Sequence, residues 1–386
     1  MDEIIGFRRL DQKIGIRNHM LVIPSVICAG HVAESIAQNV PGAVSIPNQY
    51  GCGQMGKDFE QTFRTLVGVG RNPNVGAVLV VGLGCELLRP ENLAREIAES
   101  KKPVEMITIQ NEGGTSAAIE KGISIAKRLM EKIQMVHPEP CPVSELILGL
   151  ECGGSDSTSG LASNPAVGYA SDLLIKAGGS AILTETPEMI GAEHVLAKRA
   201  VNASVADKLV SVVNAFEQKV FNEGCDIRGT QPCPGNMEGG ITTIEEKSLG
   251  CAFKAGTSPI QGVIMYSEPV CVKGLTIMDA PGHDIQSMVG MLASGAQVMV
   301  FTTGRGNPCG TPIAPVVKVT GNRETYRQMK ENTDVYVGDL LHGGSSLEDE
   351  GSKVYDTIIR VCNGELTASE KLGHREFGIW RIATTI

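Results

Sequence analysis

The stretch that decides the fold is Val75-Gly-Ala-Val-Leu-Val-Val-Gly-Leu-Gly-Cys-Glu86. Residues 76–82 form an unbroken apolar run, which is typical of a strand buried on both faces of a parallel sheet. The glycines and the cysteine that follow predict a turn at the carboxyl end of this strand. Ligands of open parallel sheets bind beyond that end. Cys85 and Glu86 therefore fall where a site is expected.

Strand-like and helix-like segments alternate on both sides of this stretch. We expect strands within 18–28, 43–47, 104–109, 146–150, 180–184, 274–278 and 295–302. We expect helices at 29–39, 58–70, 88–100, 115–133 and 163–177. The alternation predicts an α/β protein with parallel, doubly wound, Rossmann-like layers. Residues 135–143 contain three prolines and are interpreted as a linker. We therefore predict two linked α/β domains, 1–137 and 138–386, with the Gly-rich motifs in the second.

Composition excludes several classes of partner and compartment. The net charge of −9 argues against a nucleic-acid or anionic-membrane partner. The longest apolar run, residues 75–83, is far shorter than the ~20 residues that span a bilayer. The start of the chain is charged and lacks the apolar region of a secretory signal. Eleven cysteines without regular spacing favour a reducing compartment, so we expect a cytoplasmic protein.

Three cysteines, Cys52, Cys85 and Cys152, each lie beside glycine near a predicted strand end. Glycine neighbours leave room for a metal, a cluster or a substrate. If the three converge, they could hold an iron–sulfur cluster, which needs convergence in space and no local motif. They could instead give a thiolate to a mononuclear metal site, or pack as small buried hydrophobic residues. The pattern leaves these three alternatives open.

The glycine- and serine-rich loop Gly153-Gly-Ser-Asp156 opens a predicted helix. The free amides of Gly153, Gly154 and Ser155 favour binding of an anionic group at the helix N-terminus. The Asp156 side chain is a candidate metal ligand, and capping of the helix is the alternative.

The densest polar stretch, 232–250, contains Asn236, Glu245 and Lys247. The lysine offers a cation for a carboxylate, and the glutamate offers a group for proton transfer or metal binding. A capping box at a solvated helix start is an equally good interpretation. Further along, His283 lies in an acid-rich turn and is suited to proton transfer near neutrality. Arg305 lies in a glycine turn and is suited to two-point binding of a carboxylate or sulfonate.

Together these motifs resemble the altronate/galactarate dehydratase family. The resemblance extends over nearly the whole chain and is specific, because many long motifs occur in order. They are Gly6-Phe-Arg-Arg9, Gly15-Ile-Arg-Asn18, Gly51-Cys-Gly-Gln54, Gly82-Leu-Gly-Cys-Glu86, Gln110-Asn-Glu-Gly-Gly114, Gly153-Gly-Ser-Asp156, Asn164-Pro165, Thr184-Glu-Thr-Pro-Glu-Met-Ile-Gly-Ala-Glu193, Pro234-Gly-Asn236, Glu245-Glu-Lys-Ser-Leu-Gly250 and Phe301-Thr-Thr-Gly-Arg-Gly306.

The resemblance implies elimination of water from sugar acids such as altronate or galactarate, with Fe(2+) as cofactor and an iron–sulfur cluster as the alternative. It also implies a related branch, the large subunit of sulfolactate sulfo-lyase, which releases sulfite from a three-carbon hydroxy acid. Single-chain members carry an additional N-terminal domain of about ninety residues. The resemblance therefore implies a separate small subunit for this chain, and an oligomer acting on a small acidic substrate.

Within that family resemblance, we expect the following roles. Cys52, Cys85, Cys152 and Asp156 are metal ligands; Glu86, Glu245, Lys247 and His283 are catalytic; and Arg17, Asn18, Gly153, Gly154, Ser155, Asn236 and Arg305 bind substrate. Departures from the family pattern at Asn48, His283 and Tyr336 indicate an altered substrate. The Asn48 and Tyr336 departures also leave open, as an alternative, a non-catalytic subunit that only supports a partner.

Overall fold

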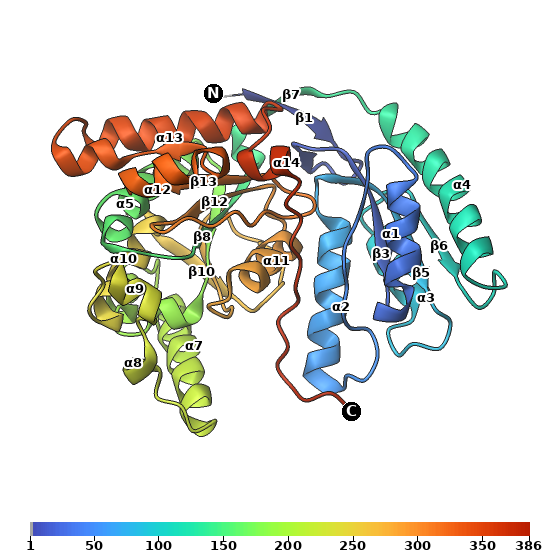
Figure 1. The fold of residues 1–386 in the computed structure, drawn as a ribbon, viewed down its shortest axis with the longest axis horizontal. Helices are drawn as coiled ribbons and strands as arrows, with labels where there is room; N and C mark the ends of the chain where they lie inside the picture. The colour runs from blue at the N-terminus through green and yellow to red at the C-terminus, as the bar shows by residue number, and fades with distance from the viewer. Residues whose placement is uncertain (1–2) are drawn as a thin grey trace.

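A computed structural model describes residues 3–386. It contains two parallel sheets with helices on both faces, so the predicted α/β class with doubly wound layers is confirmed (Figure 1). No helix within residues 3–386 combines the length and apolar character needed to cross a membrane.

The N-terminal sheet has four parallel strands in the order β4-β3-β5-β6. Their bounds are Ala43–Ser45 (β4), His19–Pro24 (β3), Val75–Gly82 (β5) and Val104–Thr108 (β6). Helices α1 (Gly30–Gln38) and α4 (Thr115–Gln134) pack on one face. Helices α2 (Gly56–Arg71) and α3 (Pro90–Ala98) pack on the other. Every residue of β5 is buried, as the apolar run predicted.

The C-terminal sheet has seven parallel strands in the order β10-β11-β9-β8-β12-β13-β14. Their bounds are Ile260–Ile264 (β10), Gly274–Met278 (β11), Ser180–Leu183 (β9), Ile147–Cys152 (β8), Val298–Thr302 (β12), Val316–Thr320 (β13) and Val335–Tyr336 (β14). Strands β9, β10 and β11 lie on one side of β8 and strands β12, β13 and β14 on the other, which makes the carboxyl end of β8 a topological switch point.

Helices cover both faces of this sheet. Helices α5 (Asn164–Lys176), α7 (Ala203–Asn222) and α13 (Leu347–Cys362) lie on one face, and α11 (Asp284–Ser294) lies on the other. Helix α11 packs against α2, so one apolar core joins the two sheets. Shorter helices complete the body: α6 (Glu193–Ala197), α8 (Ile227–Thr230), α9 (Pro234–Glu238), α10 (Ile244–Ala252), α12 (Arg323–Gln328) and α14 (Ala368–Leu372).

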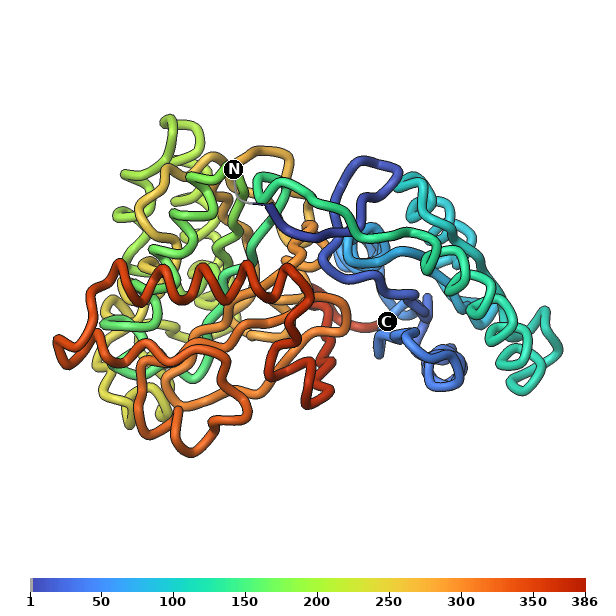
Figure 2. Tube along the Cα trace, turned by 90° about the horizontal axis from the view of Figure 1, so that it is seen from above, coloured from blue at the N-terminus to red at the C-terminus, as the bar shows by residue number. Residues whose placement is uncertain are grey.

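The interpretation of residues 135–143 as a plain linker is wrong in one respect. The segment contains β7 (Glu139–Pro142), which pairs antiparallel with β1 (Glu3–Arg8). Strand β2 (Ile14–Gly15) completes this small sheet on the other side of β1. Strand β7 lies at the edge, where prolines without N–H groups are tolerated. Figure 2 shows this segment passing beside the N-terminal strand between the two bodies.

The last residues form an extended strap along α2 (Figure 1). Arg381 pairs with the buried Asp58 at 2.7 Å, and the Gln61 amide donates to the Trp380 carbonyl at 2.7 Å. The Ile386 N–H donates to the Gly53 carbonyl at 3.0 Å. These contacts fix the chain end to the N-terminal sheet after it leaves the C-terminal one.

Candidate functional site

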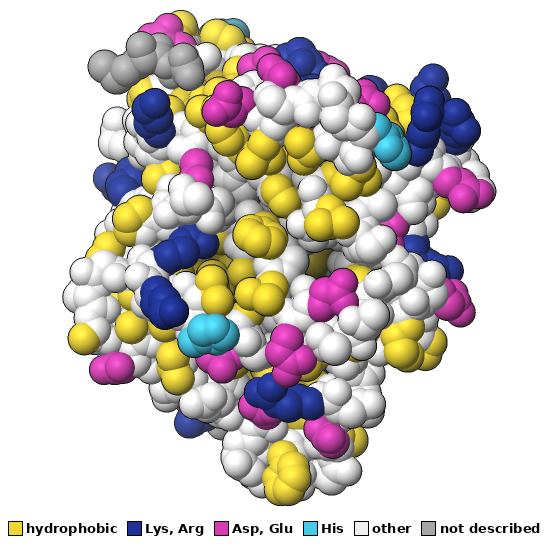
Figure 3. Space-filling model, turned by 90° about the vertical axis from the view of Figure 1, so that its left-hand side faces the viewer, with side chains coloured by type: hydrophobic (Ala, Val, Ile, Leu, Met, Phe, Trp, Pro, Cys, Tyr) yellow, Lys and Arg dark blue, Asp and Glu magenta, His cyan; other side chains and the backbone are white. Residues whose placement is uncertain are grey.

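A cavity of about 480 Å³ lies at the carboxyl end of β8. The glycine- and serine-rich loop after Cys152 forms one wall, and helix α10 with Lys247 and Cys251 forms the other. Figure 3 shows a hollow ringed by apolar side chains on the face of the molecule that carries these elements. The structure therefore brings together two motifs that are almost one hundred residues apart in sequence.

The loop after β8 turns sharply because two glycines follow Cys152. A side chain at Gly153 would overlap the Asp284 carboxylate and come within 2.7 Å of the Phe301 ring. Gly154 has φ +61°, in the left-handed region that glycine adopts without strain. The chain then enters a π-helical turn, Ser159–Ser163. Such turns are rare and occur mainly at functional sites.

Glu185 follows β9 and has an unusual backbone. Its φ of 69° and ψ of 67° place a fully buried, non-glycine residue in the left-handed region. This conformation costs about 1–3 kcal/mol and persists only where the surroundings enforce it. The strained backbone brings the Glu185 carboxylate under the cavity, next to Cys152.

Two thiols, two carboxylates and two lysines form a cluster at the floor of the cavity: Cys152, Lys247 and Cys251 line the cavity, and the other three residues contact them from behind. The Cys152 thiol donates to Glu188 at 3.0 Å, and the buried Lys254 ammonium donates to Glu185 at 2.8 Å. Lys247 pairs with Glu188 at 3.0 Å. One donor atom each of Cys152, Glu185, Glu188 and Cys251 lie within 4.8 Å of one another. We call these six residues the floor cluster.

Burial separates the pKa values of the two carboxylates. Burial, and then the Glu188 charge, raise the pKa of Glu185 to about 7. Burial would also raise the pKa of Glu188, but the Lys247 and Lys254 cations outweigh it and lower this pKa to about 2. The hydrogen bond with Cys251 and burial raise the pKa of the Cys152 thiol. Glu185 is thus poised to exchange a proton near neutrality, whereas Glu188 stays ionised.

A second acidic group adjoins the first through Glu185. Carboxylate oxygens of Glu151, Glu185 and Asp284 lie within 4.8 Å of one another. Oε1 of Glu151 and Oε1 of Glu185 are buried and have no hydrogen-bond partner within residues 3–386. Buried carboxylate oxygens are nearly always satisfied, so these two indicate a missing proton or cation.

The floor cluster fits an iron ion by the chemistry of its donors. Thiolate and carboxylate oxygen ligands suit a borderline divalent metal, and one donor atom from each of the four residues lies within 4.8 Å of the others. The lysines already offset the two carboxylate charges. Cys152, Cys251 and Glu188 are therefore the residues that could hold such an ion, with Glu185 beside them.

The structure places the three predicted cysteines on two different sheets. Cys52 and Cys85 are exposed in loops of the N-terminal sheet, whereas Cys152 is buried in the C-terminal one. Neither Cys52 nor Cys85 belongs to a metal-competent group within residues 3–386. The three cysteines follow strands of two different sheets, and a site shared by them stays a prediction.

Asp156 caps the start of the π-helical turn instead of facing a metal. Its Oδ1 accepts from the Thr158 and Ser159 amides at 2.9 and 3.1 Å, and its Oδ2 accepts from Asn322 at 2.7 Å. Ser155 is buried beside it and lends its carbonyl to Asn236 at 2.9 Å. Capping, the alternative interpretation, describes Asp156.

Three predicted residues of the N-terminal part support the backbone. Arg17 makes a two-point ion pair with Glu370 at 2.8 and 2.9 Å and donates to carbonyls near it. Asn18 donates to the Ile133 carbonyl at 2.8 Å. Glu86 is buried and accepts from the Ser25 hydroxyl at 2.6 Å. Burial raises the pKa of Glu86, but this bond and three backbone amides lower it overall.

The remaining predicted residues lie near the cavity or on the surface. Glu245 lines the cavity, is half exposed and pairs with Arg228 at 3.1 Å. Arg305 is exposed and pairs with Glu238 at 2.9 Å. His283 is exposed at the start of α11. Of the predicted catalytic residues, only Lys247 belongs to the floor cluster.

No functional role was predicted from the sequence for four residues of the floor cluster: Glu185, Glu188, Cys251 and Lys254. Glu185 and Glu188 lie in the segment 184–193, which carried part of the family resemblance, and that was the available signal. No sequence signal pointed to Lys254, because a lysine after a helix normally faces solvent.

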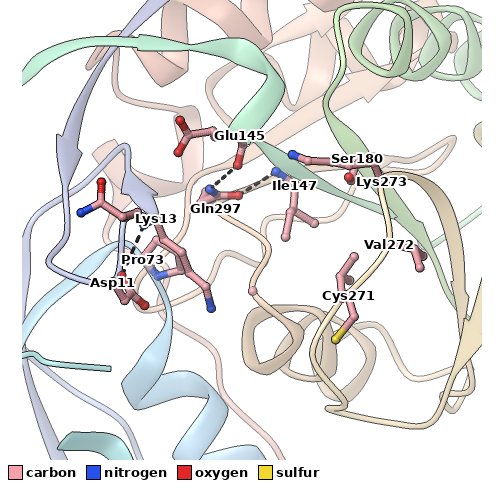
Figure 4. A pocket seen from close by; sticks show the side chains of 13 residues that line it. Asp11, Lys13, Pro73, Glu145, Ile147, Ser180, Cys271, Val272, Lys273 and Gln297 are labelled. Carbon is pink, nitrogen blue, oxygen red and sulfur yellow. Dashed lines mark hydrogen bonds between the residues drawn. The ribbon is translucent and has the colours of Figure 1, made fainter. Parts of the chain in front are cut away.

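Another cavity, of about 320 Å³, lies at the opposite, amino-terminal edge of the C-terminal sheet (Figure 4). Gln297 crosses it, accepting from the Ile147 amide at 2.7 Å and donating to the carbonyls of Ile14 and Glu145. The Gln297 side chain thus holds the small antiparallel sheet against the amino-terminal end of β8. Because ligands of parallel sheets bind at carboxyl ends, we place the functional site in the cavity beside β8.

Two family models match the chain. "D-galactarate/Altronate dehydratase, C-terminal" matches residues 143–385, and "D-galactarate dehydratase/Altronate hydrolase, second domain" matches residues 6–134. Together they span both parallel sheets.

Three known proteins are similar along almost the whole chain. Altronate dehydratase of Bacillus subtilis (strain 168) is 38% identical, covering 99% of this chain and 78% of that protein. (2R)-sulfolactate sulfo-lyase subunit beta of Chromohalobacter salexigens is 37% identical, covering 98% and 97%. Galactarate dehydratase (L-threo-forming) of Escherichia coli (strain K12) is 34% identical, covering 98% and 76%.

Proposed function

The chain belongs to the D-galactarate/altronate dehydratase family, and we propose that it is a hydro-lyase that removes water from a small hydroxy acid such as altronate or galactarate. The observation that carries this proposal is the floor cluster beneath the cavity at the switch point of the sheet. In it, Glu185 can exchange a proton near neutrality, whereas the neighbouring Glu188 stays ionised.

Dehydration of a hydroxy acid starts with removal of a proton from the carbon next to a carboxylate. Glu185 is the acceptor in this proposal, because its pKa of about 7 and its unpartnered Oε1 suit proton transfer near neutrality. Lys254 holds the other oxygen of the same carboxylate at 2.8 Å and so orients it.

Lys247 is the cation that receives the substrate carboxylate. Its side chain lines the cavity and is 14% exposed, while its ammonium group already pairs with Glu188. The Glu188 charge raises the pKa of Lys247 despite burial, so the amine stays protonated. A fixed positive charge at this place stabilises the negative charge that develops as the proton leaves.

Cys152, Cys251 and Glu188 would hold Fe(2+), with Glu185 beside them. Bound there, the ion would polarise the substrate as a Lewis acid and stabilise its developing enediolate. Three protein ligands leave positions for substrate oxygens, as in other catalytic metal sites.

Elimination of sulfite from sulfolactate is the second candidate. It is supported by the 37% identity with the Chromohalobacter subunit over 98% of this chain. Sulfite departs more readily than hydroxide, so this reaction demands less of an acid. The name of that relative also supports our proposal of a separate small subunit as partner.

We further propose a cytoplasmic location. None of the eleven cysteines is paired in a disulfide within residues 3–386, which suits a reducing compartment. An oligomeric state also remains part of the proposal.

The test is an anaerobic assay of the Fe(2+)-loaded chain, together with the small subunit, on altronate, galactarate and (2R)-sulfolactate. Keto acid or sulfite formation identifies the reaction. Glu185→Gln should lower kcat by roughly 100-fold or more, while the matched control Glu217→Gln, a half-exposed surface glutamate, keeps activity. Absence of bound iron together with no product from any substrate would contradict the proposal.

A further inference from the structure

Two thiols of the floor cluster, Cys152 and Cys251, lie beside one another. Their sulfur atoms are within 4.8 Å, and a hydrogen bond joins the two side chains. Cys152 ends β8, whereas Cys251 lies in the last turn of α10. The two residues are distant in sequence, so they are paired by the fold and not by a local motif.

The backbone holds α10 close to the turn that follows β8. A side chain added at Gly250 would place its Cβ 3.2 Å from the Cα of Gly160. Glycine at both positions lets the two backbones approach this closely. The Asn164 side-chain amide donates to the Gly250 carbonyl at 2.9 Å. Both contacts act on the residue before Cys251, so they fix this thiol opposite Cys152.

The cavity beside β8 gives a small oxidant access to both thiols. Cys152 and Cys251 both line this cavity, whose volume is about 480 Å³. Hydrogen peroxide needs little more room than a water molecule, whose share of liquid volume is about 30 Å³. Cys141 and Cys362 are as deeply buried, but they pack in the apolar core. They are therefore matched buried thiols without a thiol partner in the floor cluster.

The two sulfur atoms are close enough to bond after a small movement. A disulfide bond is about 2.05 Å long, so the atoms need to approach by no more than about 2.8 Å. Helix α10 is nine residues long and forms one wall of the cavity. Rotation of either side chain, together with a small shift of this helix, closes the gap.

We propose that Cys152 and Cys251 form a redox modification site, at which hydrogen peroxide converts the two thiols into a disulfide. The sulfur of one cysteine attacks an oxygen of the peroxide and the O–O bond breaks; the displaced hydroxide takes the thiol proton and leaves as water. The sulfur of the other cysteine then attacks the sulfenic acid. The S–S bond forms, the S–O bond breaks, and hydroxide leaves with the second thiol proton as water. Two thiols and one peroxide thus give one disulfide and two water molecules.

The modification is reversible and changes what the floor cluster can bind. A dithiol reductant restores both thiols by thiol–disulfide exchange. Because thiolates are the metal ligands of cysteine, the disulfide removes both sulfur donors of the ion site. This consequence rests on the proposed function, whereas the disulfide itself rests on the placement of the two thiols.

The test counts free thiols in the full chain after treatment with a chelator. A maleimide first blocks the exposed thiols of the native protein, and the excess is removed. Hydrogen peroxide is added and then destroyed with catalase, the chain is unfolded in urea, and a maleimide of different mass labels the thiols that are still free. Mass spectrometry of the peptides should show an at least several-fold loss of the second label on Cys152 and Cys251. Cys141 and Cys362 should keep theirs.

A peptide that joins Cys152 to Cys251 should appear at the same time, and dithiothreitol should restore both labels. The joined peptide should be absent from Cys152→Ser and present in the control Cys362→Ser. The proposal would be overturned by unchanged labels after peroxide, by an equal loss at Cys141, or by a loss that dithiothreitol does not reverse. Circular dichroism of each variant verifies that the fold is intact.

The Fe(2+) content after anaerobic loading separates this inference from the proposed function. The oxidised chain should bind at least several-fold less iron than the reduced chain. An iron content that does not change with oxidation would contradict the ion site of the proposed function, while the joined peptide would still establish the disulfide.

Discussion

Two strands of this protein end in nearly the same sequence and meet opposite environments. Strand β5 leads into Gly82-Leu-Gly-Cys-Glu86 and β8 runs through Gly149-Leu-Glu-Cys-Gly153. Cys85 is exposed, whereas Cys152 is 2% exposed. The difference arises from what covers each turn. Helix α10 and the segment after β9 close over Cys152, while no comparable element covers Cys85 within residues 3–386. A strand-end motif places a thiol at a sheet edge, and distant segments decide its chemistry.

Removing the buried cation of the floor cluster gives the largest expected effect. Lys254→Met leaves Glu185 buried without its partner, and breaking a buried pair costs about 3–5 kcal/mol of unfolding free energy. The exposed pair of Lys121 with Glu112 is the matched control, and Lys121→Met should cost under about 1 kcal/mol. Urea unfolding measures both. Similar values for the two variants would show that Lys254 is not held as described.

The two regions should respond to pH with opposite signs. The Glu185 pKa is raised from 4.5 to about 7, so its contribution to stability is complete below pH 4.5 and is lost as pH rises toward 7. Burial, followed by Arg17, lowers the pKa of His19 from 6.5 to about 4. The contribution of His19 is complete above pH 6.5 and is lost as pH falls toward 4. Each effect reaches at most about 3 kcal/mol.

Amide hydrogen exchange on the metal-free protein measures the two opposite pH trends separately, one in each sheet. Protection of β9 should fall from pH 4.5 to 7, and Glu185→Gln should flatten that trend. Protection of β3 should fall from pH 6.5 to 4, and His19→Gln should flatten it. Trends of the same sign in both strands would contradict the difference between the regions.

Thiol labelling under native conditions should separate the two strand-end cysteines. Exposed Cys28, Cys52 and Cys85 should react with a small disulfide reagent at least about 100-fold faster than Cys152 and Cys251. Burial and the raised pKa of Cys152 both slow its reaction. Mass spectrometry of labelled peptides gives the rates, and unfolding in urea should equalise them. Rapid labelling of Cys152 in the native chain would show that its cover opens easily.

The smallest effect concerns Arg17, which was predicted to bind substrate. It pairs with Glu370 at 2.8 Å and is 10% exposed, so Arg17→Met should cost about 1–2 kcal/mol of stability through lost charged hydrogen bonds. KM should not change. The exposed Arg360 pair is the control, with under about 1 kcal/mol for Arg360→Met. A raised KM without loss of stability would instead indicate that Arg17 binds substrate, as the sequence predicted.

The sequence predicted the layers well because they depend on local patterns. The apolar run of β5 and the alternation of strands and helices needed no knowledge of distant contacts. Prolines concealed β7, because their pairing at a sheet edge depends on β1, more than 130 residues earlier. The Gly-rich loop and Lys247 each belong to a family motif, and only the structure shows that both line one cavity.

The floor cluster was harder to predict because its charges are paired only in space. Lys254 resembles a surface lysine until the fold sets it against Glu185, which lies 69 positions away. Cys152 resembled Cys85 because neither strand order nor sheet membership is written in a local motif. The residues that could not be predicted are therefore those whose partners are distant in sequence.

The C-terminal strap has one consequence for how the molecule can be observed. Trp380 is the one tryptophan of the chain. Its ring meets Tyr266 edge-on with centroids 5.5 Å apart, and the Lys219 ammonium lies 5.5 Å from its centre, while its carbonyl binds α2. The indole thus touches the C-terminal body while its backbone is tied to the N-terminal one. Its fluorescence emission is a built-in optical signal of whether the two halves are joined.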